Sequence, residues 1–161
     1  MTGRREVAAT GWPAPAVVLA RHRMPVRAGE LRAERRALAA YAAFRERHYE
    51  PYLQYVGLRI GWHGAAESVV TAAFTELAVS WTAVLGSAGP AAVAWRILSD
   101  HIDDVLGRRS GHASGHQMVQ ALRDDVYLMH QQMHMSRDRI AELLGIAPDQ
   151  VSGLLQHSSK E

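Results

Sequence analysis

Apolar side chains recur at helical spacing along most of this chain, most regularly in residues 65–85. The apolar positions there alternate between steps of four and three residues, which places them on one face of an α-helix that packs against a core. These positions are Val70, Phe74, Leu77, Trp81 and Val84. No segment has the alternating pattern of a β-strand, so the chain is predicted to be all-α.

Further helices are predicted on both sides of this one. Strong helix formers follow Glu30, and Pro51 should end or kink that helix before the apolar pattern resumes. A helix restarts at Pro90, and a last helical region follows residue 116. The positions expected to face inward are Leu38, Tyr41, Phe44, His48, Leu53, Val56, Ile60, Leu98, Ile102, Val105, Val119, Leu122, Val126, Met129 and Met133.

Residues 136–157 have the pattern of two short helices joined by a glycine turn. Gly145 lies where the chain must turn, and glycine adopts positive φ without penalty. Pro148 suits the first position of the second helix. The apolar stripes of the two helices are Ile140, Leu143 and Leu144, then Val151, Leu154 and Leu155. This pattern is typical of a helix-turn-helix, whose second helix enters the DNA major groove; a helical hairpin that only packs is the alternative.

Two segments without a helical pattern divide the chain. Residues 1–29 contain three prolines and no sustained period, which predicts a flexible leader. Residues 107–116 are rich in glycine and serine and lack an apolar anchor, which predicts a flexible linker. We therefore expect two helical domains, residues 30–106 and residues 117–161, with the helix-turn-helix in the second.

Composition narrows the class of protein. Of 161 residues, 48% are apolar and 21% are charged, which is enough for a core and argues against disorder. The absence of cysteine permits a cytoplasmic location, and no apolar run reaches the roughly 18 residues of a membrane helix. We therefore predict a cytoplasmic protein without membrane contact.

Charge is distributed unevenly along the chain. The formal net charge is only +2, but residues 1–50 hold ten arginines against five acids, a net of +5, whereas residues 51–161 carry −3. A polyanion would therefore meet mainly the N-terminal third of the chain. The alternative is that these arginines form a basic helix face that is exposed to water and binds no partner.

The titratable residues do not form a recognisable catalytic or metal site. His112 and His116, like His130 and His134, have the spacing of zinc ligands on a helix, but the first pair lies in the predicted linker and the second lacks a third ligand. Neighbouring carboxylates on a helix point about 100° apart and form no acid–base pair; these are Asp103, Asp104, Asp124 and Asp125. We predict neither an enzyme nor a cofactor or metal.

Four segments resemble, in the same order and spacing, conserved regions of bacterial sigma factors of the extracytoplasmic-function group. Two are similar to the start and the next helix of the second conserved region: FRERHYEPYLQYV and AAESVVTAAFTELAVSW. The end of that region resembles PAAVAWRILSDHIDDVLGRR, and the fourth region resembles SRDRIAELLGIAPDQVSGLLQHSSK. The resemblance extends over about residues 37–160.

The resemblance implies a function in transcription initiation. The first domain would bind core RNA polymerase and capture unpaired bases of the −10 promoter element, and the second would read the −35 element as duplex. An anti-sigma factor would be a further partner. Polymerase contacts are assigned by resemblance to Glu67, Val69, Val70 and Phe74. Contacts to promoter DNA are assigned to Trp81, Trp95, Arg96, Ser99, Asp100, Arg108 and Arg109, and on the last helix to Gln150, Ser152, Gly153, Gln156 and His157.

The chain departs from the family pattern at functional positions. Small neutral side chains replace the polar Asp-Gln-Glu trio of the polymerase-docking helix: Ser68, Thr71 and Ala72. Residues 136–161 hold three basic and four acidic groups, and counterion release from phosphates supplies much of the affinity for DNA. Two functions therefore stay open: a divergent sigma factor, or a degenerate sigma-like regulator that binds a protein partner and does not initiate transcription.

Overall fold

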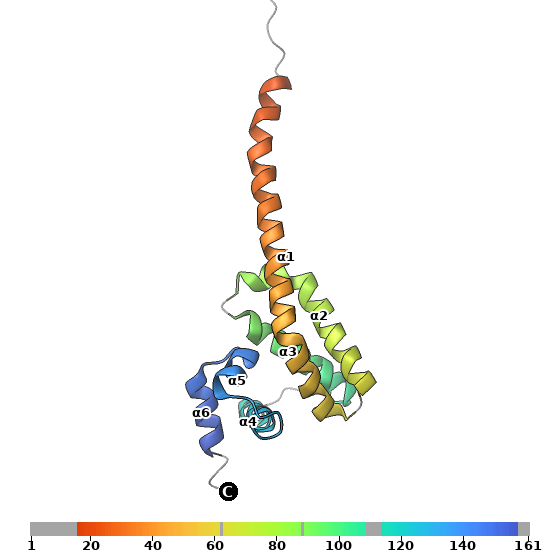
Figure 1. Cartoon of the computed structure of the whole chain (residues 1–161), viewed down its shortest axis with the longest axis vertical. Helices are drawn as coiled ribbons and strands as arrows, with labels where there is room; N and C mark the ends of the chain where they lie inside the picture. Colours follow the sequence, from red (N-terminus) through yellow and green to blue (C-terminus); the bar gives the residue numbers. More distant parts are fainter. Residues whose placement is uncertain (1–15, 62, 88, 109–113, 158–161) are drawn as a thin grey trace, which may run out of the picture. The chain divides into compact units, whose positions relative to one another are not determined.

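The all-α prediction is confirmed by a computed structural model, which describes residues 16–61, 63–87, 89–108 and 114–157. Within these ranges the chain forms helices and no strand (Figure 1). The helices are α1 (Ala16–Ile60), α2 (His63–Leu85), α3 (Pro90–Val105), α4 (Gly115–Gln131), α5 (Arg137–Leu144) and α6 (Pro148–His157).

The helix α1 is longer than the sequence pattern predicts. It runs through Pro51 to Ile60 without ending, so the first predicted helix and its continuation are one element. It also begins at Ala16, so the predicted flexible leader overlaps a helix from that residue on, and residues 1–15 lie outside the described ranges. The chain divides into two compact units, residues 1–36 and residues 37–161, and α1 contributes to both.

Within residues 37–161, α1, α2 and α3 meet around a cluster of aromatic rings. The Phe44 ring lies 5.3 Å from the Trp81 ring and 6.4 Å from the Phe74 ring, measured between centroids. Polar atoms of this cluster bond to backbone, because the Tyr41 hydroxyl donates to the Phe74 carbonyl at 2.8 Å and Trp81 Nε1 donates to the Ala37 carbonyl at 2.9 Å. Burial therefore leaves neither donor unpaired.

Most positions that were predicted to face inward do so. All five apolar positions of α2 are buried, as are Val56, Leu98, Ile102, Val126 and Met129. Three predictions are wrong, since Leu38, Val105 and Val119 are 64%, 53% and 51% exposed. Val105 is the last residue of α3, and the next residue, Leu106, packs against the core in its place.

By length and composition alone, α2 also passes a test for a membrane-spanning segment. An 18-residue stretch within residues 64–85 has a mean hydropathy of 1.5, although polar residues interrupt its apolar runs. This is weak evidence, because the core helix of a globular protein passes the same test. The apolar face of α2 packs against α1 and α3, which gives its hydropathy a structural explanation.

The C-terminal helices share the core of the N-terminal ones. One apolar cluster contains Tyr52 of α1, Leu98 of α3, Met129 of α4 and Leu143 of α5. Residues 109–113 of the predicted linker lie outside the described ranges, and its last two residues belong to α4. The division into two domains stays a prediction. Residues 37–106 of the first predicted domain and the described part of the second lie in one compact unit, residues 37–161.

Candidate functional site

The turn between α5 and α6 has the backbone geometry that the sequence predicts. The Ser136 side chain caps α5 by accepting from the Arg139 N–H at 3.2 Å, and Gly145 ends the helix in the left-handed conformation with φ 66° and ψ 35°. Pro148 is the first residue of α6. The predicted stripes are buried at Ile140, Leu143, Leu144 and Val151, and partly buried at Leu154 and Leu155.

Gly145 is also constrained by a neighbour that sequence reasoning missed. A Cβ atom at this position would overlap the backbone of Ala91 and Ala92, at the start of α3. The glycine therefore permits both the sharp turn and the close approach of α3 to the α5–α6 pair.

The outward residues of α6 carry no lysine or arginine. Gln150 and Gln156 are exposed, Ser152 and Gly153 are half-buried, and the side chain of His157 is outside the described set. The Gln150 side-chain oxygen accepts from the Ala147 N–H at 3.1 Å, and the Ser152 hydroxyl donates to the Pro148 carbonyl at 3.2 Å. Two of the predicted base-reading side chains thus already make local hydrogen bonds.

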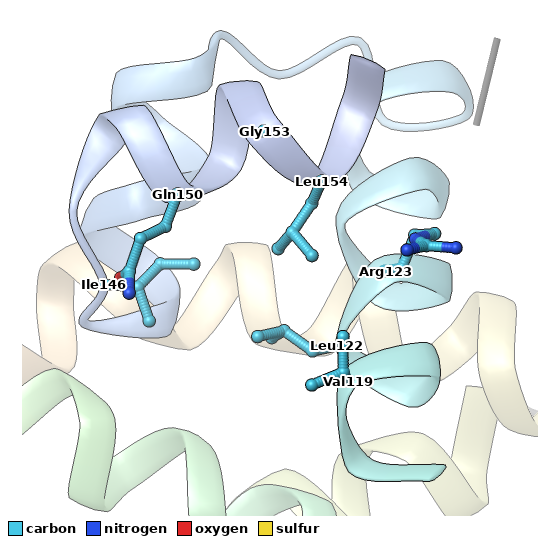
Figure 2. A pocket seen from close by; sticks show the side chains of 7 residues that line it. All are labelled: Val119, Leu122, Arg123, Ile146, Gln150, Gly153 and Leu154. Carbon is cyan, nitrogen blue, oxygen red and sulfur yellow. The ribbon is translucent and has the colours of Figure 1, made fainter. Parts of the chain in front are cut away.

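An apolar groove lies between α4 and α6, with a volume of about 460 Å³ (Figure 2). Val119, Leu122 and Arg123 line it from α4, and Leu154 faces them from α6 (Figure 2). The remaining lining residues are Ile146, Gln150 and Gly153. This groove explains why Val119 is exposed, and it places two predicted DNA contacts, Gln150 and Gly153, beside an apolar hollow.

The residues assigned to the −10 element lie in two environments. Trp81 and Trp95 are buried, with 5% and 8% of their surface exposed, and they contact other aromatic rings. Ser99 is half-buried and its hydroxyl donates to the Trp95 carbonyl at 2.9 Å. Exposed positions are Arg96, Asp100 and Arg108, and Arg109 lies outside the described residues. The accessible part of this surface therefore combines two cations with an acid.

The residues assigned to polymerase binding are mostly in the core. Val69, Val70 and Phe74 are at most 5% exposed, and only Glu67 is open to solvent. The outward face of α2 instead presents the three positions at which the chain departs from the family pattern, Ser68, Thr71 and Ala72. A partner that docks on α2 in this conformation meets these small neutral side chains together with the exposed carboxylates of Glu67 and Glu76.

Polar contacts between α1 and α5, remote in sequence, were not predicted. Arg47 donates through Nε and Nη2 to the two carboxylate oxygens of Glu142, the latter bond at 3.0 Å, and Arg139 Nη1 donates to the same carboxylate at 2.7 Å. We call these three residues the α1–α5 ion-pair cluster. The hydrogen bond from Arg47, with support from Arg139, lowers the pKa of Glu142 to about 2.

A buried histidine lies beside this cluster, and a half-buried carboxyl group lies between α1 and α4. His48 is 3% exposed, its ring is stacked on Phe44 at 3.9 Å, and its Nε2 has no hydrogen-bond partner among the described residues. Burial lowers the pKa of His48, which favours the neutral ring. On the α4 side, the Tyr55 hydroxyl donates to Asp125 at 2.5 Å, and burial raises the pKa of that carboxyl group.

The histidines form no metal site within the described part of the chain, where no group of three potential ligands occurs. His130 Nδ1 lies 3.0 Å from the Met135 carbonyl, and His134 occupies the turn after α4 with φ 52°. His112 lies outside the described residues. The zinc-like spacing of the second pair thus coincides with a turn in which one histidine bonds to backbone.

Comparisons with known proteins give no relative. The sequence matches no protein-family model, and neither curated proteins nor solved structures yielded a similar protein.

Proposed function

We propose that this chain is a sigma-factor-like protein that binds core RNA polymerase and directs it to promoters through the −10 and −35 elements. The observation that supports this most is the α5–α6 pair. Its serine cap, left-handed Gly145 and Pro148 start are the backbone features of a helix-turn-helix, and its apolar stripes leave Gln150 and Gln156 outward. The four sigma-like segments occur in the family's order, and they lie on α1 to α3 and on α5 and α6.

The charge of α6 makes polymerase necessary in this proposal. Phosphate neutralisation by lysine and arginine supplies most non-specific affinity for DNA, and α6 has neither residue. Glutamine still reads adenine as a bidentate partner, which provides selectivity without much affinity. The protein alone should therefore bind promoter DNA weakly, and polymerase should supply the missing affinity.

The test is run-off transcription with core RNA polymerase on a library of genomic fragments. Specific transcripts that require the protein support the proposal, whereas absence of both polymerase binding and transcripts rejects it. Thr71→Arg, on the exposed face of α2, should weaken polymerase binding roughly tenfold, as a well-placed interface change does. Ala121→Arg, at an exposed position of α4, is the matched control and should leave binding unchanged.

A second candidate function is favoured by the groove between α4 and α6. In that reading the chain is a sigma-like regulator that binds a protein partner and does not initiate transcription. Apolar hollows suit protein side chains better than a phosphate backbone, and Gln150 and Gly153 line this one. Polymerase binding without any transcript would favour this candidate over the first.

A further inference from the structure

Residues 27–36 of α1 are exposed to solvent at every position. They belong to the unit formed by residues 1–36, and none of them is part of the apolar core. Most helices in proteins are stabilised by packing of an apolar face, and this segment buries none of its side chains. Its whole surface is therefore open to a partner.

Three arginines of this segment share one face of the helix. Arg32, Arg35 and Arg36 have the i, i+3, i+4 spacing that makes side chains neighbours on a helix. The acids lie on the other side, because at 3.6 residues per turn Glu34 is about 200° from both Arg32 and Arg36; Glu30 is one turn before Glu34. We call the three arginines the α1 arginine face. Within the described part of the chain, they take part in no hydrogen bond or ion pair.

This arrangement differs from an ordinary solvated helix face. Charged helix surfaces usually place an acid three or four residues from a base, as Glu30 is placed relative to Arg27. Arg32 instead has two arginines at those distances, and like charges at such positions repel and destabilise the helix. Binding of a polyanion removes this repulsion and releases the counterions of the polyanion. The α1 arginine face is therefore suited to a partner with closely spaced negative charges.

The neighbouring residues select among the possible polyanions. A helix that binds an anionic membrane carries several large apolar side chains opposite its basic face, and in residues 27–36 only Leu31 is large and apolar. Single-stranded nucleic acid is bound by stacking of bases on aromatic rings, and this segment has no aromatic residue. The phosphate backbone of duplex DNA needs neither, and the arginine guanidinium group matches phosphate geometry.

We propose that the α1 arginine face is a further DNA-binding site, which contacts the phosphate backbone of duplex DNA without reading its sequence. It lies before the sigma-like segments, which begin at about residue 37, so the resemblance does not assign it. It provides cations that α6 lacks. The site goes beyond the proposed function and does not rest on it, because contact with the phosphate backbone requires no polymerase.

The salt dependence of binding gives the expected size of the effect. Each phosphate that is neutralised contributes about 0.9 to the slope of log K against log salt, so the α1 arginine face should contribute about 2.7. That contribution corresponds to a roughly 40-fold loss of affinity between about 50 and 200 mM salt.

The test is fluorescence anisotropy of the full chain with a labelled duplex of random sequence, over that salt range and without polymerase. Arg32→Gln with Arg36→Gln removes two cations and keeps good helix formers of similar length. This pair of changes should flatten the slope by about 1.8 and lower the affinity at about 50 mM salt tenfold or more. Arg32→Lys with Arg36→Lys should keep the slope, because counterion release depends on charge.

The matched control uses two other exposed arginines of the same helix. Arg27→Gln with Arg45→Gln changes the net charge by the same amount, and both side chains point away from the α1 arginine face. This control should leave the slope nearly unchanged. Equal flattening by the two pairs of changes would show that net charge alone matters and would overturn the proposal.

Three further results would also overturn it. They are an unchanged slope in the Arg32→Gln, Arg36→Gln variant, no binding of the parent chain to the duplex, and tighter binding to vesicles of phosphatidylglycerol and phosphatidylcholine than to the duplex. Failure of run-off transcription, in contrast, would reject the proposed function and leave this site standing, because polymerase is absent from the binding assay.

Discussion

Two features require glycine at position 145, its positive φ and its contact with the backbone of α3, and only the first can be predicted from the sequence. The left-handed backbone follows from its place after the last apolar position of α5, which is why the turn was predicted correctly. The contact with Ala91 and Ala92 depends on how α3 approaches, and no local pattern encodes that approach.

Gly145→Ala and Gly61→Ala separate these constraints. Both glycines have positive φ, 66° and 77°, but only at Gly145 would a Cβ atom meet other atoms. We expect Gly61→Ala to lower the free energy of unfolding by about 1 kcal/mol through backbone strain, and Gly145→Ala by about 3 kcal/mol through strain and overlap. Equal losses in urea unfolding would show that the approach to α3 has no energetic consequence.

His48 should make the fold acid-sensitive. Its pKa in the folded chain is below the usual 6.5, because burial disfavours the charged ring, and the nearest charged groups are Arg139 and Glu142. As pH falls through 6.5, the unfolded chain takes up a proton that the folded chain resists, so stability falls. The free energy of unfolding should decline between pH 7.5 and 5.5, and His48→Leu should flatten that decline. His116→Ala, at an exposed position, should retain it.

Among the elements, α1 departs most from its sequence pattern. Pro51 was expected to end or kink the helix, yet α1 runs on to Ile60. Pro51 has no N–H to donate to the Arg47 carbonyl, which costs α1 one internal hydrogen bond. Apolar packing on both sides of Pro51 offsets that cost, and Arg139 Nη2 donates to the Arg47 carbonyl instead. Arg139 is 92 positions from Arg47 in the chain, so no local rule could have predicted this bond.

A double-mutant cycle measures this compensation. Arg139→Ala should destabilise the parent chain because the Arg47 carbonyl loses its donor, whereas Pro51→Ala restores a helical N–H to that carbonyl. We therefore expect Arg139→Ala to cost about 1 kcal/mol less in the Pro51→Ala background. The same cycle with Arg137→Ala should give no coupling, and zero coupling with Arg139 would contradict the assignment.

The α6 helix should gain DNA affinity from a single cation. Gln156 is exposed and lies on the face assigned to the −35 element. Gln156→Arg should strengthen binding to duplex DNA and steepen the slope of log K against log salt by about 0.9, the contribution of one neutralised phosphate. Fluorescence anisotropy over a salt series measures the slope. Gln131→Arg on α4 is the control, and an equal effect there would remove α6 from the DNA surface.

Over the whole molecule, the sequence predicts the helices better than their assembly. Helical periodicity located the core faces of α2, α5 and α6, and glycine and proline located the turn between α5 and α6. The packing of α5 on α1 depends on Arg47, Glu142 and Tyr52, polar residues that carry no periodic signal. The burial of Val70 and Trp81 was therefore predictable from the period of α2, whereas the burial of Trp95 follows from the packing of α3 on α1.

The most direct test of the proposed function is run-off transcription with core RNA polymerase on genomic fragments, compared with and without the chain. We expect the chain to bind core polymerase and to give specific transcripts that are absent without it. A chain that neither binds core polymerase nor gives any specific transcript would contradict the proposed function.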